Sequence, residues 1–405
     1  MKRLGLIVNP VAGVGGRVGL KGSDGAEILR RALELGAVRD APRRARLALE
    51  RLGRVRDHIE VVTWPGEMGA DEACAAGFEP RVLGTFRGRP TWAAAERAHG
   101  HAEAALGGAG EFMLTSPADT EQAARDLLAV GVDLILFAGG DGTARNICDA
   151  VGQQVPVIGV PAGVKIHSAV YATTPAAAGD VAALFLHERP AAVRLREGEV
   201  MDIDEEAFRE NRVSAYLYGY LSVPYARGLT QSDKAGGVAG EERALSDVAT
   251  EVIRDMRPDA LYILGPGTTT RTIMIRLGLE KTLLGVDALL GGALAAADAT
   301  EEDLLRLLRA HAAAHIVVTV IGGQGHIFGR GNQQISPAVI RLVGTAAITI
   351  IATQTKLLSL GGRPLLVDTG DPALDAELAG YAKVVTGLGE RTMYKVGVEA
   401  PIPLP

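Results

Sequence analysis

The stretch Phe137-Ala138-Gly139-Gly140-Asp141-Gly142-Thr143 places a carboxylate in the middle of a glycine-rich turn. The short apolar run before it, residues 134–137, predicts a buried strand, and residues 143–150 predict the first turns of a helix. In such a turn the free backbone N–H groups and the positive helix end converge, and glycine lets a polyanion come close. We therefore predict a phosphate-binding turn at residues 139–143.

Asp141 indicates what the turn does with a phosphate. A carboxylate beside bound phosphate is repelled unless it holds a cation or accepts a proton from a hydroxyl that becomes a nucleophile. Both roles occur in kinases, so the turn points to phosphoryl transfer. The alternative is that Asp-Gly marks only a turn, but residues 143–146 lack the alternating strand that a hairpin requires.

The turn resembles the motif shared by NAD kinases, diacylglycerol kinases and sphingosine kinases and, more distantly, phosphofructokinases. More of the chain is similar to the ATP-NAD kinase-like group, which includes relatives of acetoin-catabolism protein X. The matching stretches keep one order along the sequence: residues 5–13 (GLIVNPVAG), 159–165 (GVPAGVK), 265–270 (GPGTTT) and 322–328 (GGQGHIF). The resemblance implies an α/β, NAD kinase-like fold.

Composition excludes several other classes of protein. The 405 residues suffice for two domains, and 47% hydrophobic with 22% charged residues is typical of a globular chain. A formal net charge of −6 offers no basic field for nucleic acid or anionic lipid. No stretch approaches the roughly 20 apolar residues of a membrane span, and Asn9-Pro10 ends the apolar N-terminal run too early for a signal peptide. With two cysteines, too few for a disulfide framework, we expect a cytoplasmic protein without nucleic-acid or membrane partners.

The alternation of elements predicts the domain organisation. Strand-like and helical runs alternate through residues 1–190, which predicts a parallel sheet covered by helices in an N-terminal α/β nucleotide-binding domain. Residues 70–110, rich in Ala, Gly and Arg, are interpreted as an insertion. From about Arg194 the pattern becomes β-rich, so residues 191–345 are predicted to form a substrate domain. The likeness to NAD kinases implies that the C-terminal segment, residues 346–405, packs back on the N-terminal domain.

Further candidate residues follow the strands of the first domain. By resemblance, Asn9 faces the nucleotide, although Asn-Pro is also a common turn dipeptide. Lys165, His167 and Ser168 follow the strand 157–160 at the predicted carboxyl edge of the sheet, where open α/β sheets bind ligands. A cation and two hydrogen-bonding side chains suit a phosphate or a ribose. The alternative is a surface lysine and a capping serine.

A glycine loop of the second domain resembles the loop with which NAD kinases grip a nucleotide. It contains Gly267, Thr268, Thr269 and Thr270 directly after a predicted strand. Hydroxyl groups and free amides together make a polar pocket. One of the threonines could instead cap the helix that follows.

A second glycine-rich loop supplies Gly323, Gln324 and Arg330 as candidate nucleotide-binding residues. An arginine in such a loop can clamp a phosphate through two parallel hydrogen bonds. The alternative is a structural loop that links the domains.

Two other patterns are interpreted as decoys. Asp368-Thr369-Gly370 matches the tripeptide of aspartic proteases, but that chemistry needs a pair of carboxylates, and residues 373–379 predict a helix. His311 and His315 have metal-ligand spacing on a predicted helix, but Ala312 stands where a zinc protease needs Glu.

The resemblance implies a kinase that moves a phosphoryl group from ATP, or from inorganic polyphosphate, to the ribose 2′-hydroxyl of NAD and so yields NADP. Gly139, Gly140, Gly142 and Thr143 would position the donor phosphates with Mg²⁺, while Asp141 accepts the hydroxyl proton. We expect a homo-oligomer that binds NAD and ATP.

The sequence departs from the family at one point. The Asn-Glu or Asn-Asp pair that holds the acceptor ribose in NAD kinases has no clear equivalent near residues 221–224. A kinase for a different small hydroxyl-bearing acceptor therefore stays open, as does a non-catalytic nucleotide sensor with the same fold. A lipid kinase is less favoured, because the sequence shows no amphipathic membrane stretch.

Overall fold

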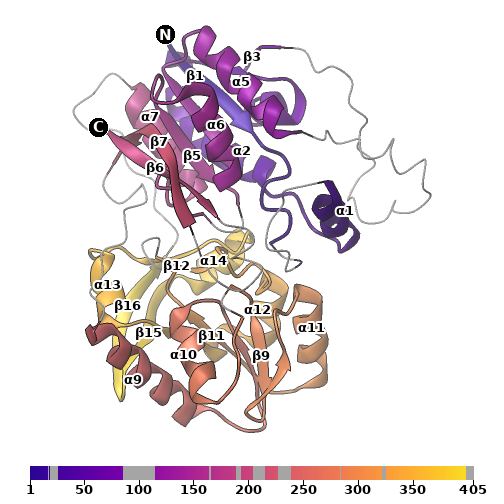
Figure 1. Ribbon diagram of the computed structural model, residues 1–405, viewed down its shortest axis with the longest axis vertical. Helices are drawn as coiled ribbons and strands as arrows, with labels where there is room; N and C mark the ends of the chain where they lie inside the picture. Colours follow the sequence, from indigo (N-terminus) through magenta and orange to yellow (C-terminus); the bar gives the residue numbers. More distant parts are fainter. Residues whose placement is uncertain are drawn as a thin grey trace.

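The computed structural model describes residues 1–16, 18, 26–84, 115–163, 166–187, 193–203, 215–226, 239–282, 284–321 and 325–397. They form two α/β lobes, stacked one above the other in Figure 1. We call residues 1–226 the first lobe and residues 239–397 the second lobe. Each lobe is built on its own sheet, as the predicted two-domain α/β fold requires.

The sheet of the first lobe is entirely parallel, which confirms the predicted α/β fold. Its strand order β3-β2-β1-β4-β5 reverses direction between β1 and β4, and ligands bind at the carboxyl ends of strands at such a point. Most residues of its central strands are buried, as expected for strands covered on both faces. The strands are β1 (Lys2–Val8), β2 (Ile59–Thr63), β3 (Arg81–Val82), β4 (Leu134–Gly139) and β5 (Val157–Pro161).

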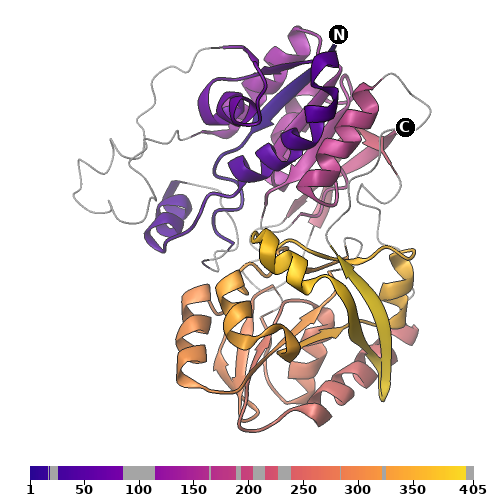
Figure 2. The same ribbon diagram turned by 180° about the vertical axis from the view of Figure 1, so that it is seen from behind.

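Helices pack over this sheet, as the two opposite views in Figures 1 and 2 show. Helix α2 packs against α7, and α5 packs against α6. Local sequence sets where helices begin: Thr174 accepts a hydrogen bond from the Ala177 N–H at 3.0 Å, and Pro175 occupies the first turn, as predicted. The helices are α1 (Ala26–Glu34), α2 (Ala41–Leu52), α3 (Ala70–Ala75), α5 (Pro117–Ala129), α6 (Asp141–Val151) and α7 (Pro175–Leu186), with 3-10 turns at Gly53–His58 and Gly66–Met68.

The β-rich pattern that starts at Arg194 is an antiparallel ribbon of β6 (Arg194–Ile203) and β7 (Ala215–Tyr225). Val200, Leu221 and Val223 of this ribbon are fully buried in the core of the first lobe. The ribbon therefore extends the first lobe, and the second lobe begins beyond it with α9 (Ala239–Asp255).

The second lobe contains a mixed sheet of nine strands in the order β10-β9-β8-β11-β13-β15-β16-β14-β12. The strands are β8 (Leu261–Leu264), β9 (Asp287–Leu290), β10 (Ala293–Ala296), β11 (Ala314–Thr319), β12 (His326–Phe328), β13 (Ile348–Ile351), β14 (Leu365–Val367), β15 (Gly380–Gly387) and β16 (Glu390–Gly397). After α9, its helices are α10 (Thr268–Arg276), α11 (Glu301–Ala310), α12 (Pro337–Val343), α13 (Gln354–Ser359) and α14 (Pro372–Leu378), with a 3-10 turn at Thr345–Ala347.

Strand directions divide this sheet into two halves. Strands β8, β11, β13 and β15 run parallel, β16 runs antiparallel to β15, and β14 and β12 follow the direction of β16. The carboxyl ends of β8 and β11 therefore lie at one edge of the sheet, and those of β14 and β12 lie at the opposite edge. The loop at 265–267 and the loop at 329–330 emerge at these opposite edges.

The C-terminal segment, described up to residue 397, joins the second lobe, which corrects the expectation that residues 346–405 return to the first domain. Strand β13 pairs in parallel with β11, and β14, β15 and β16 complete the same sheet. The physical reason is that the apolar strand β13 covers an edge of β11 that would otherwise be unpaired. Contact with the first lobe is made by Asp368, directly after β14, which forms an ion pair with Arg44 of α2.

Two smaller expectations also have structural outcomes. Strand β3 pairs with β2, so the first part of the insertion predicted at 70–110 belongs to the sheet, while residues 85–114 lie outside the described residues. His311 ends α11, whereas His315 lies in β11 and stacks on the Tyr262 ring with centroids 5.0 Å apart, so the predicted shared helix face is wrong. No helix in the described ranges has the length and apolar character needed to cross a membrane.

Candidate active site at the glycine turn

The glycine turn joins β4 to α6, as the sequence predicts. Gly140 is the N-cap and offers no side chain, so the first N–H groups of α6 have no partner within the helix. Glycine is required by close contacts: a Cβ on Gly139 would lie 2.4 Å from the Thr143 side chain, and one on Gly140 would lie 3.2 Å from Gly163 Cα. With Gly142 in the first turn of α6, the turn presents backbone donors and no bulk to an anion.

Asp141 begins α6, and its carboxylate is held by the loop that follows β5. Its Oδ2 accepts a hydrogen bond from the His167 N–H at 2.8 Å, and its Oδ1 accepts bonds from the Ser168 N–H at 3.1 Å and the Ser168 hydroxyl at 2.6 Å. Asp141 is only 8% exposed. Burial raises the pKa of this carboxyl, although the three hydrogen bonds oppose the rise, and nearby Asp202 raises it further. An oriented carboxylate of raised pKa, with a free lone pair on Oδ2, is able to accept a proton.

Ser168 and His167 position Asp141. The Ser168 side chain is fully buried, and its Oγ also accepts a hydrogen bond from the Met201 N–H at 3.0 Å, which ties the loop to β6. His167 contributes its backbone N–H, and its side chain is partly buried. Lys165, the third candidate in this loop, lies outside the described residues.

Asn9 follows β1 and lies beside the start of α6. Its Nδ2 donates to the Thr143 hydroxyl at 3.0 Å, and its Oδ1 accepts a hydrogen bond from the Val11 N–H at 3.2 Å. Both ends of its amide are therefore engaged by the protein. This geometry favours the turn-forming interpretation of Asn9 and draws the buried Thr143 into the same network.

Tyr171 supports the turn from behind and was missed by the sequence analysis. Its hydroxyl donates to the Gly140 carbonyl at 2.5 Å, and its ring packs edge-on against Phe137 with centroids 5.3 Å apart. Burial, and then Asp141, raise the pKa of Tyr171 well above its ordinary value, so the hydroxyl keeps its proton. The available signal was Gly159: a glycine inside a strand often marks close approach, and a Cβ there would lie 2.3 Å from the Tyr171 ring.

Two of the three hydroxyl groups in the threonine loop of the second lobe are hydrogen-bonded within that lobe. The Thr270 hydroxyl lies within bonding distance of the Gly265 carbonyl at 2.7 Å and the Gly267 carbonyl at 2.9 Å. The Thr269 hydroxyl accepts a hydrogen bond from Lys356 Nζ at 2.9 Å, and both side chains are fully buried. Thr268 is the exposed member of the three. The structure does not bring this loop to the sheet edge that carries Arg330.

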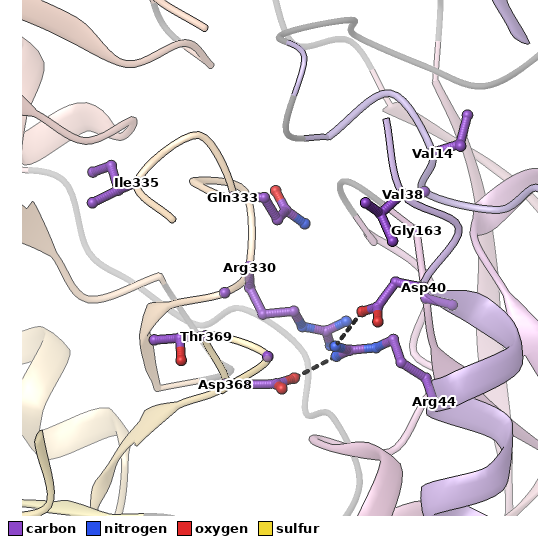
Figure 3. Close-up of a pocket in the computed structure, with 14 residues that line it drawn as sticks. Val14, Val38, Asp40, Arg44, Gly163, Arg330, Gln333, Ile335, Asp368 and Thr369 are labelled. Atoms are coloured by element: carbon purple, nitrogen blue, oxygen red, sulfur yellow. Dashed lines mark hydrogen bonds and ion pairs between the residues drawn. The ribbon is translucent and has the colours of Figure 1, made fainter. Parts of the chain in front are cut away.

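A pocket of about 60 Å³ lies between the two lobes (Figure 3). Arg44 enters it from α2, and Arg330 and Asp368 enter it from the loops after β12 and β14. Gly163 also lines the pocket and is the residue that Gly140 approaches, so the pocket adjoins the glycine turn. Arg330 is 4% exposed, whereas Gly323 and Gln324 lie outside the described residues.

Arg44 and Asp368 were not identified from the sequence as functional residues. Arg44 donates to the Pro161 carbonyl at 2.5 Å, pairs with Asp40 at 3.3 Å, and forms an ion pair with Asp368 of the other lobe. The available signal was an arginine on the apolar stripe of α2, between Ala41 and Ala48. Asp368, dismissed as a protease decoy, is the partner that this arginine needs.

The described residues do not form a magnesium cage. They contain no group of three or more His, Cys, Asp and Glu side chains able to hold a metal ion. Asp141 has three of its lone-pair positions occupied by hydrogen bonds.

Comparison with known proteins gives matches over most of the chain. Residues 4–189 match the family model of the ATP-NAD kinase N-terminal domain, and residues 257–396 match that of the ATP-NAD kinase C-terminal domain. No curated protein sequence matches. One similar solved structure is that of a candidate diacylglycerol kinase from Bacillus anthracis str. Sterne, at 15% identity and a TM-score of 0.21. The match covers 65% of this chain and 60% of that protein, and similarity this low supports no inference about activity.

Proposed function

The chain belongs to the ATP-NAD kinase family, and from this premise we propose that it transfers a phosphoryl group from ATP, or from inorganic polyphosphate, to the ribose 2′-hydroxyl of NAD and yields NADP. Membership of the family supports a kinase that phosphorylates a hydroxyl group. The identity of the acceptor and of the donor is the proposed part.

The single observation that carries the proposal is the buried Asp141 carboxylate at the start of α6, held by three hydrogen bonds beside open helix N–H groups. The donor phosphates would bind these N–H groups, with Mg²⁺ shielding part of their charge. The acceptor hydroxyl would donate to Oδ2 of Asp141. As the hydroxyl oxygen attacks the terminal phosphorus, its proton passes to the carboxylate and the bond to the leaving phosphate breaks.

Roles for the other candidate residues follow from their contacts. Gly139, Gly140 and Gly142 keep the turn open to phosphate, while Ser168 and the His167 N–H orient Asp141 and act as positioning groups. The hydrogen bond from Asn9 to Thr143 joins the end of β1 to the first turn of α6. Lys165, Gly323, Gln324, Gly267 and Thr268 are retained as candidate contacts to the nucleotides.

Membership of the family supports NAD as the acceptor. The Asn-Glu or Asn-Asp pair that holds the acceptor ribose in NAD kinases gives no such support, because it has no clear equivalent near residues 221–224. A different small hydroxyl-bearing acceptor would use the same turn and the same base. A sensor that binds nucleotides without turnover would keep the turn but produce no phosphorylated product.

The test uses the full purified chain with Mg²⁺, NAD and either ATP or polyphosphate, and detects NADP with an NADP-specific dehydrogenase. NADP formation that disappears in Asp141→Asn supports the proposal. ADP release with another hydroxyl acceptor, but no NADP, would replace NAD as the acceptor. A melting shift with NAD and no product under any condition would favour the sensor and overturn the enzyme assignment.

A further inference from the structure

Arg330 lines the pocket between the lobes, and one hydrogen-bonding edge of its side chain is unused. Its Nε and Nη2 atoms are both buried and donate to no acceptor among the described residues. These two atoms form the edge of the guanidinium that binds a carboxylate or a phosphate through two parallel hydrogen bonds. Buried polar groups in native proteins normally have a partner, so this edge requires an explanation.

Other arginines of the same chain show how this edge is ordinarily used. Arg51 binds Asp180 through Nε at 3.2 Å and Nη2 at 2.8 Å, and Arg257 binds Asp259 through the same two atoms at 3.1 and 2.7 Å. The side chains of Arg51 and Arg257 are 23% and 61% exposed, whereas Arg330 is 4% exposed. The edge is therefore open in the most buried arginine of the three, where an unpaired charge is least favourable.

The carboxylates near Arg330 are already engaged by other cations. Asp368 pairs with Arg44, and Asp40 is shared between Arg44 and Arg43. Arg44 therefore takes up these two carboxylates, and Arg330 forms no ion pair with the described residues. Figure 3 shows the Arg330 side chain reaching across the pocket toward Asp40 and Arg44, with the drawn ion pairs made by Arg44.

The pKa values of Arg330 and its neighbour His326 also indicate a buried positive charge that has no ion pair in the described part of the chain. Burial, and then the charge of Arg44, lower the pKa of Arg330 to about 9, while Asp368, Tyr171 and Asp141 raise it. His326 of β12 is fully buried, and burial together with Arg330 and Arg44 lowers its pKa well below the ordinary value, so it is neutral. At neutral pH Arg330 remains charged, and a bound anion would offset the free-energy cost of burying that charge.

The pocket has room for an anion of limited size. A single water needs roughly 10–15 Å³ of accessible cavity volume, so about 60 Å³ is enough for a group of a few non-hydrogen atoms, such as a phosphate. Gly163, which lines the pocket, has its Cα 3.2 Å from where a Cβ on Gly140 of the glycine turn would lie. A phosphate in the pocket would therefore lie next to a phosphate bound at the turn.

We propose that the Nε and Nη2 edge of Arg330 is a second phosphate-binding site, which the Arg44–Asp368 ion pair holds between the lobes, and that it selects ligands with two or more linked phosphates. The linked phosphates span the glycine turn and the pocket. Inorganic pyrophosphate or polyphosphate and the pyrophosphate of a dinucleotide share this chemistry. This proposal rests on the proposed function in one respect: the phosphate that binds Arg330 is part of a substrate.

The test measures binding of orthophosphate, pyrophosphate and NAD to the full chain by titration calorimetry, with melting temperatures recorded without ligand. We expect pyrophosphate to bind more tightly than orthophosphate. Arg330→Met should weaken pyrophosphate binding by about 10- to 100-fold, the usual size of a charged bidentate contact. Arg330→Lys, which keeps the charge but not the paired edge, should lose a smaller part of the affinity. The matched control is Arg257→Met, which removes an exposed arginine and should leave binding unchanged.

The melting temperature separates a ligand-binding arginine from a structural one. Because the buried edge has no partner, Arg330→Met should melt at the same temperature as the parent or higher without ligand. A lower melting temperature together with unchanged pyrophosphate affinity would overturn the proposal. Equal affinity for orthophosphate and pyrophosphate would also overturn it.

The same titrations identify the source of the linked phosphates. If Arg330→Met weakens NAD binding, the site binds the pyrophosphate of the dinucleotide. If it weakens pyrophosphate binding alone, the site binds the inorganic chain. Pyrophosphate binding that needs Arg330 while no NADP is ever formed would refute the proposed function and leave this site standing.

Discussion

Two turns of this protein have the same local design, a strand followed by glycine and the start of a helix. The first joins β4 to α6 at residues 139–143, and the second joins β8 to α10 at residues 265–270. In the first turn the polar groups are bonded from outside, by the loop after β5, by Asn9 and by Tyr171. In the second turn Thr270 bonds to carbonyls of its own loop, and Thr269 accepts a hydrogen bond from Lys356 of α13 in the same lobe.

The difference shows why a sequence pattern does not by itself make a ligand site. Both helices begin at a glycine without a side-chain cap, but it is the first turn that lies where the strand order reverses and the second lobe approaches. A turn that bonds to itself mainly stabilises the strand-to-helix junction. Changes in the first turn should therefore affect ligands and turnover, and changes in the second should affect stability.

The largest expected effect is that of Asp141→Asn. Loss of the proton acceptor should lower phosphoryl transfer by on the order of 10²–10⁴. The amide has one acceptor oxygen where the carboxylate has two, so it cannot accept from both the His167 N–H and Ser168. The control is Ser168→Ala, which loosens Asp141 but keeps the carboxylate, and it should lose much less. The rate of ADP release measures both variants. Near-native turnover in Asp141→Asn would contradict the role of this residue.

A matched glycine pair tests the comparison directly. A Cβ on Gly140 would lie 3.2 Å from its nearest neighbour atom, and one on Gly265 would lie 3.3 Å away, so alanine crowds both turns about equally. Gly140→Ala should weaken ATP-Mg²⁺ binding about tenfold or more, because its methyl group lies at the approach to the phosphate. Gly265→Ala should leave the affinity unchanged. Equal losses in both variants, measured by titration, would mean that the two turns do not differ in this way.

The pH dependence of pyrophosphate binding separates the pocket from the turn. Arg330 is protonated below its pKa of about 9, so affinity should stay constant from pH 7 to 8 and fall as pH rises above about 9, by up to tenfold per pH unit. Backbone N–H groups do not titrate in this range. In Arg330→Met the affinity should be lower and nearly independent of pH, and a decline above pH 9 in that variant would assign the titration to another group.

The smallest effect is expected for Thr270→Val in the second turn. The substitution removes a hydroxyl that bonds two loop carbonyls, which should lower the free energy of unfolding by about 1–3 kcal/mol. ATP and NAD binding should not change. Urea unfolding and titration together provide the measurement, and a loss of NAD affinity without a loss of stability would place the threonine loop in the nucleotide site.

Much of the first lobe was predictable because its signals are local. The strand, glycine turn and helix at 134–151 and the Thr174-Pro175 helix start depend on residues a few positions apart. The prediction that the C-terminal segment returns to the first domain failed because it came from family likeness. The pairing of β13 with β11 depends instead on two apolar strands that lie far apart in the sequence.

The sequence by itself determined the glycine turn, its carboxylate and the kinase family, since these need only a short motif and the order of a few such motifs along the chain. Only the tertiary structure decided what surrounds Asp141 and Arg330. Arg44 and Asp368 are separated by 324 positions, yet they join the two lobes. Whether Arg330 has a partner depends on which carboxylates the folded lobes have already paired, and no local pattern of residues contains that information.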